Sequence, residues 1–257
     1  MPSHVVTSQG DRIRWVDVPG DRSPARLFVH GLGASGAHHF AAVLAHPALA
    51  GHRSLVVDLL GYGTSDRPAD FDHTTTSHAR SLGALLQDLA LGPVDVVAHS
   101  MGGAIAIELA TDHPELVDRL VLVDANLDGS TPLPGAGNSR GIAARAERDF
   151  VAAPDHEVRA VVGDDWWATM QTADRLAVHR NAVSLVQGVE PSWRHQLMAL
   201  PHDRTFLHPE AGGPPDGDGE LRAAGVDVVA VPECGHVIMV DNPDGFATAV
   251  AEALLRS

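Results

Sequence analysis

The sequence predicts an α/β fold, in which a mostly parallel sheet is covered by helices on both faces. Short apolar runs of four to six residues alternate with longer amphipathic stretches along most of the 257-residue chain. Strands that are buried on both faces of a parallel sheet have this continuous apolar character. A composition of 44% hydrophobic and 20% charged residues supplies enough apolar surface for a sizeable core.

The predicted strands are short and end at turn residues. Residues 12–18 alternate polar and apolar side chains and stop at Pro19-Gly20, as a hairpin strand does. The compact apolar runs after it show no such alternation, so we expect them to be buried on both faces. These further strands are expected at residues 26–29, 54–57, 94–98, 120–123, 205–207 and 226–231.

The predicted helices lie between these strands. Residues 76–91 have the amphipathic spacing of a helix that covers a sheet. Residues 101–111 have a helical pattern up to Pro114, whose ring cannot continue a helix. Two more helices are expected at residues 37–49 and 246–255. Strands that alternate with helices in this way are typical of a parallel, doubly covered sheet.

The stretch from residue 127 to residue 200 has helical patterns and no strand pattern. Helices are expected within it at residues 139–151 and 169–185. We therefore divide the chain into a core, residues 1–126 and 201–257, and a helical insertion, or cap, of residues 127–200.

The charged residues and the cysteine exclude several kinds of chemistry. All 18 basic residues are arginines, so no lysine can act as a nucleophile, a Schiff base or a P-loop phosphate ligand. The 33 acidic residues give a net charge of −15, which disfavours nucleic acid and anionic membranes as ligands. The single cysteine, Cys234, excludes an internal disulfide and a multi-cysteine metal site. We expect no metal and no cofactor.

The sequence also predicts where the protein works. Residues 1–6 lack a basic segment followed by an apolar one, and no stretch approaches 18 consecutive apolar residues. We therefore expect a cytoplasmic protein with a small hydrophobic molecule as its partner, and neither nucleic acid nor membrane. A homodimer is compatible with the sequence.

A serine directly follows one predicted strand and precedes a helix that opens with two glycines. The segment is Ala98-His99-Ser100-Met101-Gly102-Gly103. On such a sharp turn the serine hydroxyl stands above the sheet, and the residues two before and two after it must be small. Ala98 and Gly102 meet that requirement. The alternative interpretation of Ser100 is a plain helix cap.

A glycine-rich segment follows an earlier predicted strand. His30-Gly31-Leu32-Gly33 comes after residues 26–29, and glycine there lets the backbone approach a ligand closely. We expect the N–H groups of Leu32 and Met101 to form a two-donor oxyanion hole. A flexible turn is the alternative.

One histidine stands out among the 16 in the chain. His236 follows the last predicted strand, from which its ring can reach over the sheet to Ser100. Cys234, two residues earlier, is expected to be a structural thiol. Solvated surface positions are expected for His38, His39, His46 and His179.

With these segments, the chain resembles the α/β-hydrolase fold superfamily over about residues 25–125 and 204–255. The resemblance implies that Ser100 is the nucleophile and that His236 is the general base and acid. A serine nucleophile argues against haloalkane dehalogenase and epoxide hydrolase chemistry, which uses aspartate. The matching pieces are His30-Gly31-Leu32-Gly33, Asp58-Leu59-Leu60-Gly61-Tyr62-Gly63-Thr64-Ser65, Ala98-His99-Ser100-Met101-Gly102-Gly103 and Gly235-His236.

The resemblance also implies a carboxylate that orients the histidine. Most relatives carry it after the next-to-last strand, where this chain reads Leu207-His208-Pro209-Glu210-Ala211-Gly212, with glycine at the expected place. Asp124, at the end of the strand before the insertion, is the expected acid, as in some α/β-hydrolases. Asp216 and Asp218 remain alternatives, and Glu210 lies close to the strand end. A turn cap is the other interpretation of Asp124.

Three of the four tryptophans, Trp166, Trp167 and Trp193, lie in the insertion, although aromatic residues make up only 4% of the chain. We expect a substrate pocket between insertion and core, with Gly31, Trp166, Trp167 and Met170 as binding residues. The alternative is that these side chains pack the insertion itself.

Together these features predict a serine hydrolase that cleaves a hydrophobic carboxylic ester or lactone through an acyl-enzyme. A C–C bond hydrolase acting on a dienoic ketone is an alternative within the same fold. A biosynthetic lyase or cyclase with the same serine–histidine site, and a non-catalytic small-molecule receptor, are alternatives from other classes.

Overall fold

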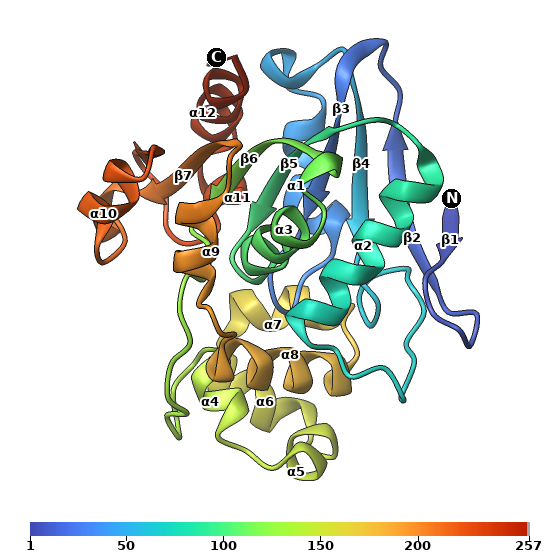
Figure 1. Ribbon diagram of the computed structural model, residues 1–257. Helices are drawn as coiled ribbons and strands as arrows, with labels where there is room; N and C mark the ends of the chain where they lie inside the picture. Colours follow the sequence, from blue (N-terminus) through green and yellow to red (C-terminus); the bar gives the residue numbers. More distant parts are fainter. Residues whose placement is uncertain (256–257) are drawn as a thin grey trace.

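One sheet runs through the part of the chain that the computed structural model describes, residues 1–255. Its eight strands lie in the order β1-β2-β4-β3-β5-β6-β7-β8 (Figure 1). β2 is antiparallel to both its neighbours, and all other pairs are parallel. The strands are β1 (Ser3–Val5), β2 (Arg12–Val18), β3 (Arg22–Val29), β4 (His52–Asp58), β5 (Val94–His99), β6 (Val117–Val123), β7 (Asp203–Pro209) and β8 (Val226–Val231).

Helices cover both faces of this sheet and fill the connection between β6 and β7. Short 3₁₀ turns lie at Pro47–Leu49, Pro114–Leu116 and Glu210–Gly212. The α-helices are α1 (Gly36–Leu44), α2 (Thr75–Leu89), α3 (Met101–Asp112), α4 (Ser139–Ala143), α5 (Glu147–Val151), α6 (Asp155–Val162), α7 (Asp164–Met170), α8 (Arg175–Gln187), α9 (Trp193–Ala199), α10 (Asp218–Ala223), α11 (Ile238–Asp241) and α12 (Pro243–Leu255).

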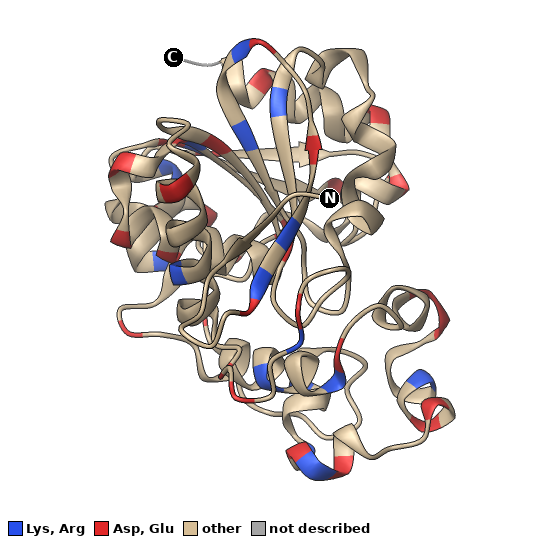
Figure 2. Cartoon of the chain, turned by 90° about the vertical axis from the view of Figure 1, so that its right-hand side faces the viewer, with Lys and Arg blue, Asp and Glu red and all other residues tan. Residues whose placement is uncertain are grey.

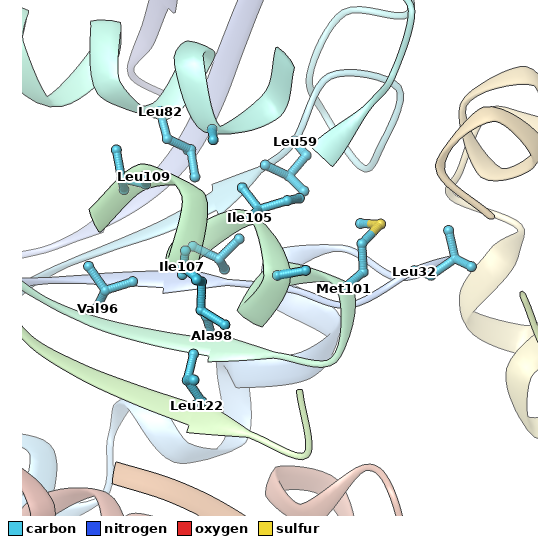
Figure 3. Close-up of a cluster of buried hydrophobic side chains, with 14 of the residues drawn as sticks. Leu32, Leu59, Leu82, Val96, Ala98, Met101, Ile105, Ile107, Leu109 and Leu122 are labelled. Atoms are coloured by element: carbon cyan, nitrogen blue, oxygen red, sulfur yellow. The ribbon is translucent and has the colours of Figure 1, made fainter. Parts of the chain in front are cut away.

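Successive residues of the central strands face opposite layers. On β5, Val96 and Ala98 lie in the core beneath α2 and α3, whereas Val97 packs toward α1 and α12. This alternation follows from the two-residue repeat of a strand and explains the continuous apolar run. Figure 3 shows the first of these layers, with Leu82 of α2 and Ile105 of α3 among its side chains.

The helical insertion lies at one end of the sheet, where α4 to α8 gather (Figure 1). Backbone hydrogen bonds join it to the loop after β4. Gly63 N–H donates to Thr172 O at 2.9 Å, and Asp174 N–H donates to Gly61 O at 2.7 Å. These hydrogen bonds join the middle of the insertion to the core.

Three predicted helices have a different extent in the structure. The helix expected at residues 37–49 ends early, because Pro47 has a fixed φ and no N–H and starts a separate 3₁₀ turn. The helix expected at 139–151 is two short helices, α4 and α5. The helix expected at 169–185 is interrupted, because the side chain of Asp174 caps the start of α8.

Acidic positions are spread over the core and the insertion, with arginines among them (Figure 2). Many of these charges form surface pairs, such as Arg53 Nη2 to Asp17 Oδ2 at 2.6 Å. Exposed pairs of this kind add about 0–1 kcal/mol each to stability. Residues 1–255 contain no helix with the length and hydropathy of a transmembrane span.

Buried imidazole rings cluster between α2 and α8. The rings of His73 and His78 have centroids 5.5 Å apart and lie against Phe71, and both side chains are buried. Burial is the main cause that lowers the pKa of His73 to about 4 and the pKa of His78 well below 6.5. Both rings are therefore neutral in the folded protein at pH 7.

Replacing His78 with leucine is expected to make the protein less sensitive to acid. Below pH 6.5 the unfolded histidine takes up a proton that the folded one does not, so the free energy of unfolding falls as the pH falls. This loss develops between pH 7 and pH 5, and His78→Leu should not show it. Urea unfolding of both proteins at the two pH values measures the difference.

The comparison with the unmodified protein separates His78 from other titrating groups. Burial raises the pKa of Asp95 to about 6, which changes stability in the opposite direction, but equally in both proteins. If the two proteins lose stability in parallel between pH 7 and pH 5, the buried neutral state of His78 is not the cause.

Candidate active site

Four loops meet past the carboxyl ends of the parallel strands. The strand order reverses around β3, which has β4 on one side and β5 on the other. Ligands of open α/β sheets bind at such a reversal, outside the carboxyl ends of the strands. The loop after β3, Ser100 after β5, Asp124 after β6 and His236 after β8 all lie at this end of the sheet.

Ser100 occupies a strained turn between β5 and α3. Its φ of 52° and ψ of −119° lie outside the regions that residues with a side chain favour. Its N–H donates to Val123 O at 2.9 Å, which ties the turn to β6. Ser100 stands at the N-cap position of α3, but its side chain makes no capping hydrogen bond to that helix, so its hydroxyl is available to other partners.

Gly102, two residues after the serine, has no room for a side chain. A Cβ there would lie 2.6 Å from the backbone oxygens of both Val29 and His30. Gly102→Ala is therefore expected to lower the free energy of unfolding by about 3 kcal/mol, or to prevent folding. Gly219→Ala is the control, because a Cβ at that position meets nothing within 4 Å. Equal urea midpoints for the two variants would contradict this packing.

Three polar side chains form one hydrogen-bonded line. His236 Nδ1–H donates to Asp124 Oδ2 at 2.6 Å, and Ser100 Oγ–H donates to His236 Nε2 at 3.1 Å. Because a carboxylate only accepts, the imidazole proton sits on Nδ1 and the lone pair of Nε2 faces the serine. This arrangement can take a proton from the hydroxyl and stabilise the imidazolium that results.

The loop that carries His236 is held from two sides. The buried His99 donates its Nε2–H to His236 O at 2.9 Å, and Gly235 N–H donates to Asp241 Oδ2 at 2.9 Å. Burial lowers the pKa of His99 well below its ordinary value, so this ring stays neutral beside His236. Cys234 donates its thiol to a backbone oxygen at 3.2 Å, and burial raises the pKa of that thiol, which suits a structural role.

The other candidate acids lie elsewhere. Asp124 contacts His236 from a backbone position with a φ of 44°. Asp218 instead pairs at 3.2 Å with an arginine one turn later on α10. Within residues 1–255, no hydrogen bond joins His236 to Glu210, Asp216 or Asp218. Asp124 is therefore the carboxylate that the structure brings to the histidine.

Two backbone N–H groups beside the serine are free to bind a negative oxygen. In the described part of the chain, neither Leu32 N–H nor Met101 N–H has a hydrogen-bond acceptor. Met101 is the first residue of α3, where the helix dipole attracts negative charge. The peptide that carries Leu32 N–H is held by His30, whose Nδ1–H donates to Gly31 O at 2.8 Å. His30 Nε2 in turn accepts the backbone N–H of Leu59, in the loop after β4, at 3.1 Å. This second contact fixes the tautomer of His30.

His39 and His179 are buried, so the predicted surface positions are wrong for these two. His39 is 5% exposed, packs edge-on against His99 with centroids 4.8 Å apart, and accepts Gly31 N–H at 3.4 Å. His179 is also 5% exposed and lies 2.8 Å from a backbone oxygen of the insertion. Both lie on helix faces that tertiary packing turns inward. His38 is exposed, as predicted.

A cavity of about 1000 Å³ opens over the serine, between core and insertion. This is the upper end of the size range of small-molecule sites. The apolar part of its wall is Leu32, Val162, Trp166, Ala168, Leu185, Val237 and Val240. The polar part includes His38, Asn126, Asp128, Ser130, Asn138, Ser139, Arg140, Asp165, Thr169 and Asp241.

The four predicted substrate-binding residues lie in different surroundings. Trp166 is on the cavity wall. Gly31 lies behind the serine, where a Cβ would be 3.2 Å from Ser100 Cβ. Trp167 does not line the cavity, and its ring packs against the guanidinium of an arginine of α8. Met170 is 3% exposed and belongs to the core. Neighbours on a helix point about 100° apart, and here the Trp167 ring is turned toward α8 while Trp166 faces the cavity.

The model of a known family matches residues 24–180, which is more than half of the chain. The description of that family is the alpha/beta hydrolase fold. The chain belongs to the α/β-hydrolase family. The predicted fold and family are therefore confirmed, and this enzyme is an α/β-hydrolase.

The names of proteins similar to this hydrolase refer to different classes of substrate. The mouse sn-1-specific diacylglycerol lipase ABHD11 is 29% identical over 254 residues, 90% of this chain and 81% of the relative. An esterase from Thermogutta terrifontis has a TM-score of 0.77 at 20% identity, covering 98% of this chain and 97% of its own. The enol-lactonase from Burkholderia xenovorans has a TM-score of 0.75 at 21% identity, and the match covers 99% of this chain and 100% of the lactonase chain. At these identities the two structures show the shared fold.

Proposed function

We propose that this hydrolase cleaves a carboxylic ester or lactone through an acyl-enzyme on Ser100, with His236 and Asp124 completing a catalytic triad. The observation that carries the proposal is the hydrogen-bonded line from Ser100 Oγ through His236 to Asp124, with distances of 3.1 and 2.6 Å. Membership of a hydrolase family, with a lipase among the relatives, supports the same chemistry.

Acylation begins when Ser100 Oγ attacks the carbonyl carbon while its proton passes to His236 Nε2. The carbonyl oxygen becomes an oxyanion and accepts hydrogen bonds from the N–H groups of Leu32 and Met101. His236 then gives its proton to the departing alkoxide, and the carbon–oxygen bond of the ester breaks. In a lactone, the alcohol formed remains part of the acyl group.

Deacylation repeats these steps with water in place of the serine. His236 Nε2 takes a proton from the water, whose oxygen attacks the acyl carbon. The second oxyanion uses the same two donors. The bond to Ser100 Oγ then breaks, the proton returns from His236 to the serine, and the carboxylic acid leaves.

The cavity wall supports a substrate with an apolar group. Leu32, Val162, Trp166 and Leu185 provide apolar surface beside the serine. Burying an apolar acyl or alcohol group against such a wall favours binding by about 25 cal/mol per Å². The net charge of −15 favours neutral or cationic substrates over polyanions.

A fluorophosphonate probe and a panel of substrates test the proposal. The panel contains p-nitrophenyl esters, lactones and a dienoic ketone, and Ser100→Ala is the control. Labelling of the unmodified protein with turnover of an ester or lactone, both absent in the variant, is the expected result. Cleavage of the dienoic ketone alone would favour the C–C bond hydrolase. A folded protein that the probe does not label would overturn serine catalysis in favour of a lyase or a receptor.

A further inference from the structure

We infer that Trp166 and Thr169, in helix α7 of the insertion, position the oxyanion hole of the core. The inference rests on the proposed serine hydrolysis and adds to it a role for the insertion in the chemical step. Both residues line the cavity, but their polar atoms face the backbone of the loop after β3.

Helix α7 contacts two successive carbonyl groups of that loop. Trp166 Nε1–H donates to Leu32 O at 3.0 Å, and Thr169 Oγ1–H donates to Gly33 O at 2.8 Å. The threonine hydroxyl also lies 3.0 Å from Trp166 O in its own helix, so its proton is shared between two oxygens. The two residues are one helical turn apart and therefore point to the same side of α7.

The first of these contacts fixes the donor that the oxyanion needs. Leu32 N–H belongs to the peptide unit whose oxygen, Gly31 O, is held by His30 at 2.8 Å. The next peptide unit carries Leu32 O, which Trp166 holds. Because peptide units are planar, holding both of them fixes the two backbone dihedral angles of Leu32. One anchor comes from the core and the other from the insertion.

The loop requires such an anchor because of its sequence. Gly33 has a φ of 72° and, like all glycines, has access to many other conformations. A Cβ at Gly33 would lie 2.7 Å from Trp166 Nε1 and 3.2 Å from Met170 Cε, so the indole lies directly against the backbone. The second contact, from Thr169 to Gly33 O, holds the peptide unit that follows.

Oxyanion donors accelerate a reaction only when they are already in place, since reorientation in the transition state costs free energy. Leu32 N–H has no acceptor of its own within residues 1–255, so no other hydrogen bond on that group holds it. The indole N–H and the threonine hydroxyl therefore act through the backbone, as positioning groups for Leu32.

The Trp166→Phe and Thr169→Val variants remove one N–H and one hydroxyl while keeping the ring and the branched shape. We expect each to lower kcat for a p-nitrophenyl ester by about 10- to 100-fold, with KM within about 3-fold of the unmodified value. Thr169→Ser keeps the hydroxyl and should retain the activity. Trp15→Phe on β2 and Thr248→Val in α12 are matched controls, because neither residue lines the cavity.

Inhibition by a trifluoromethyl ketone separates positioning from packing. The ketone forms a tetrahedral adduct with the serine and places an oxyanion in the hole, so its inhibition constant should rise by the factor by which kcat/KM falls. The carboxylic acid product, which has no oxyanion of this kind, should bind equally well to all variants. Melting temperatures show whether each variant is folded. If Trp166→Phe does not fold, the kinetics of Thr169→Val test the inference instead.

Two results would overturn the inference. One is a folded variant with unchanged kcat. The other is a loss of kcat with no change in ketone affinity. Failure of the proposed function is a different outcome, because the unmodified protein would then neither react with the fluorophosphonate nor turn over the ester.

Discussion

The Ser100→Ala variant is expected to lose about 10⁶-fold in kcat for ester hydrolysis, the scale seen when a serine nucleophile is removed. Alanine has no oxygen to attack the carbonyl, and His236 then has no hydroxyl to deprotonate. The folded state should persist, because the only hydrogen bond of the hydroxyl within residues 1–255 is the one at 3.1 Å to His236. Initial rates with a p-nitrophenyl ester and urea unfolding measure the two effects.

A matched control separates the nucleophile from a general effect of losing a hydroxyl. Ser81→Ala removes a serine hydroxyl that donates to a backbone oxygen of α2 at 3.0 Å, away from the cavity. It should keep the unmodified kcat. If Ser100→Ala retains more than about one hundredth of the activity, Ser100 is not the nucleophile. Removing a nucleophile lowers kcat by a much larger factor than about 100.

The Asp124→Asn variant is expected to lower kcat by roughly 10⁴-fold while leaving the fold intact. The carboxylate accepts the Nδ1 proton of His236 at 2.6 Å, which keeps the lone pair of Nε2 toward the serine. An amide can donate to the ring instead and so favour the wrong tautomer. The φ of 44° at this position is one that asparagine adopts readily, so the backbone need not change.

The alternative acids supply the controls for Asp124→Asn. Asp216→Asn and Asp218→Asn should keep nearly all activity, because neither carboxylate contacts His236 in residues 1–255. Steady-state kinetics of the three variants decides between them. Near-normal activity of Asp124→Asn, or a large loss in one of the other two, would contradict the assignment.

The sequence predicted the sheet and the positions of Ser100 and His236 because their signals are local. A continuous apolar run indicates a buried parallel strand, and the small or polar residues that follow indicate where the strand ends. The nucleophile turn needs a serine and two small residues within five positions, and Gly102 has a Cβ position 2.6 Å from backbone oxygens. Such requirements act on neighbouring residues and are visible in the sequence.

The acid was a harder prediction, because its position depends on partners far along the chain. The distance between Asp124 and His236 is 112 residues in sequence but 2.6 Å between their polar atoms. Only the order of strands in the sheet brings the ends of β6 and β8 together. The family resemblance, rather than spacing or composition, therefore pointed to Asp124.

The wall of the cavity was predicted only in part, because the rotation of a short helix decides which side chains face it. Trp166 lines the cavity and Trp167 does not, although the two are adjacent and identical. Trp193 is fully buried and donates its indole N–H to Glu108 at 2.8 Å, so it packs the molecule rather than the pocket. His39 is buried beside the serine for the same reason, because the packing of α1 turns it inward.

The proposed mechanism requires that Ser100 becomes covalently acylated during turnover. The most direct measurement is mass spectrometry of the protein after reaction with a p-nitrophenyl ester and quenching in acid. One added acyl group is expected, located on the peptide that contains Ser100 and absent from Ser100→Ala. Turnover of the ester with no acyl group on the protein, or with the acyl group on another residue such as Cys234, would contradict it.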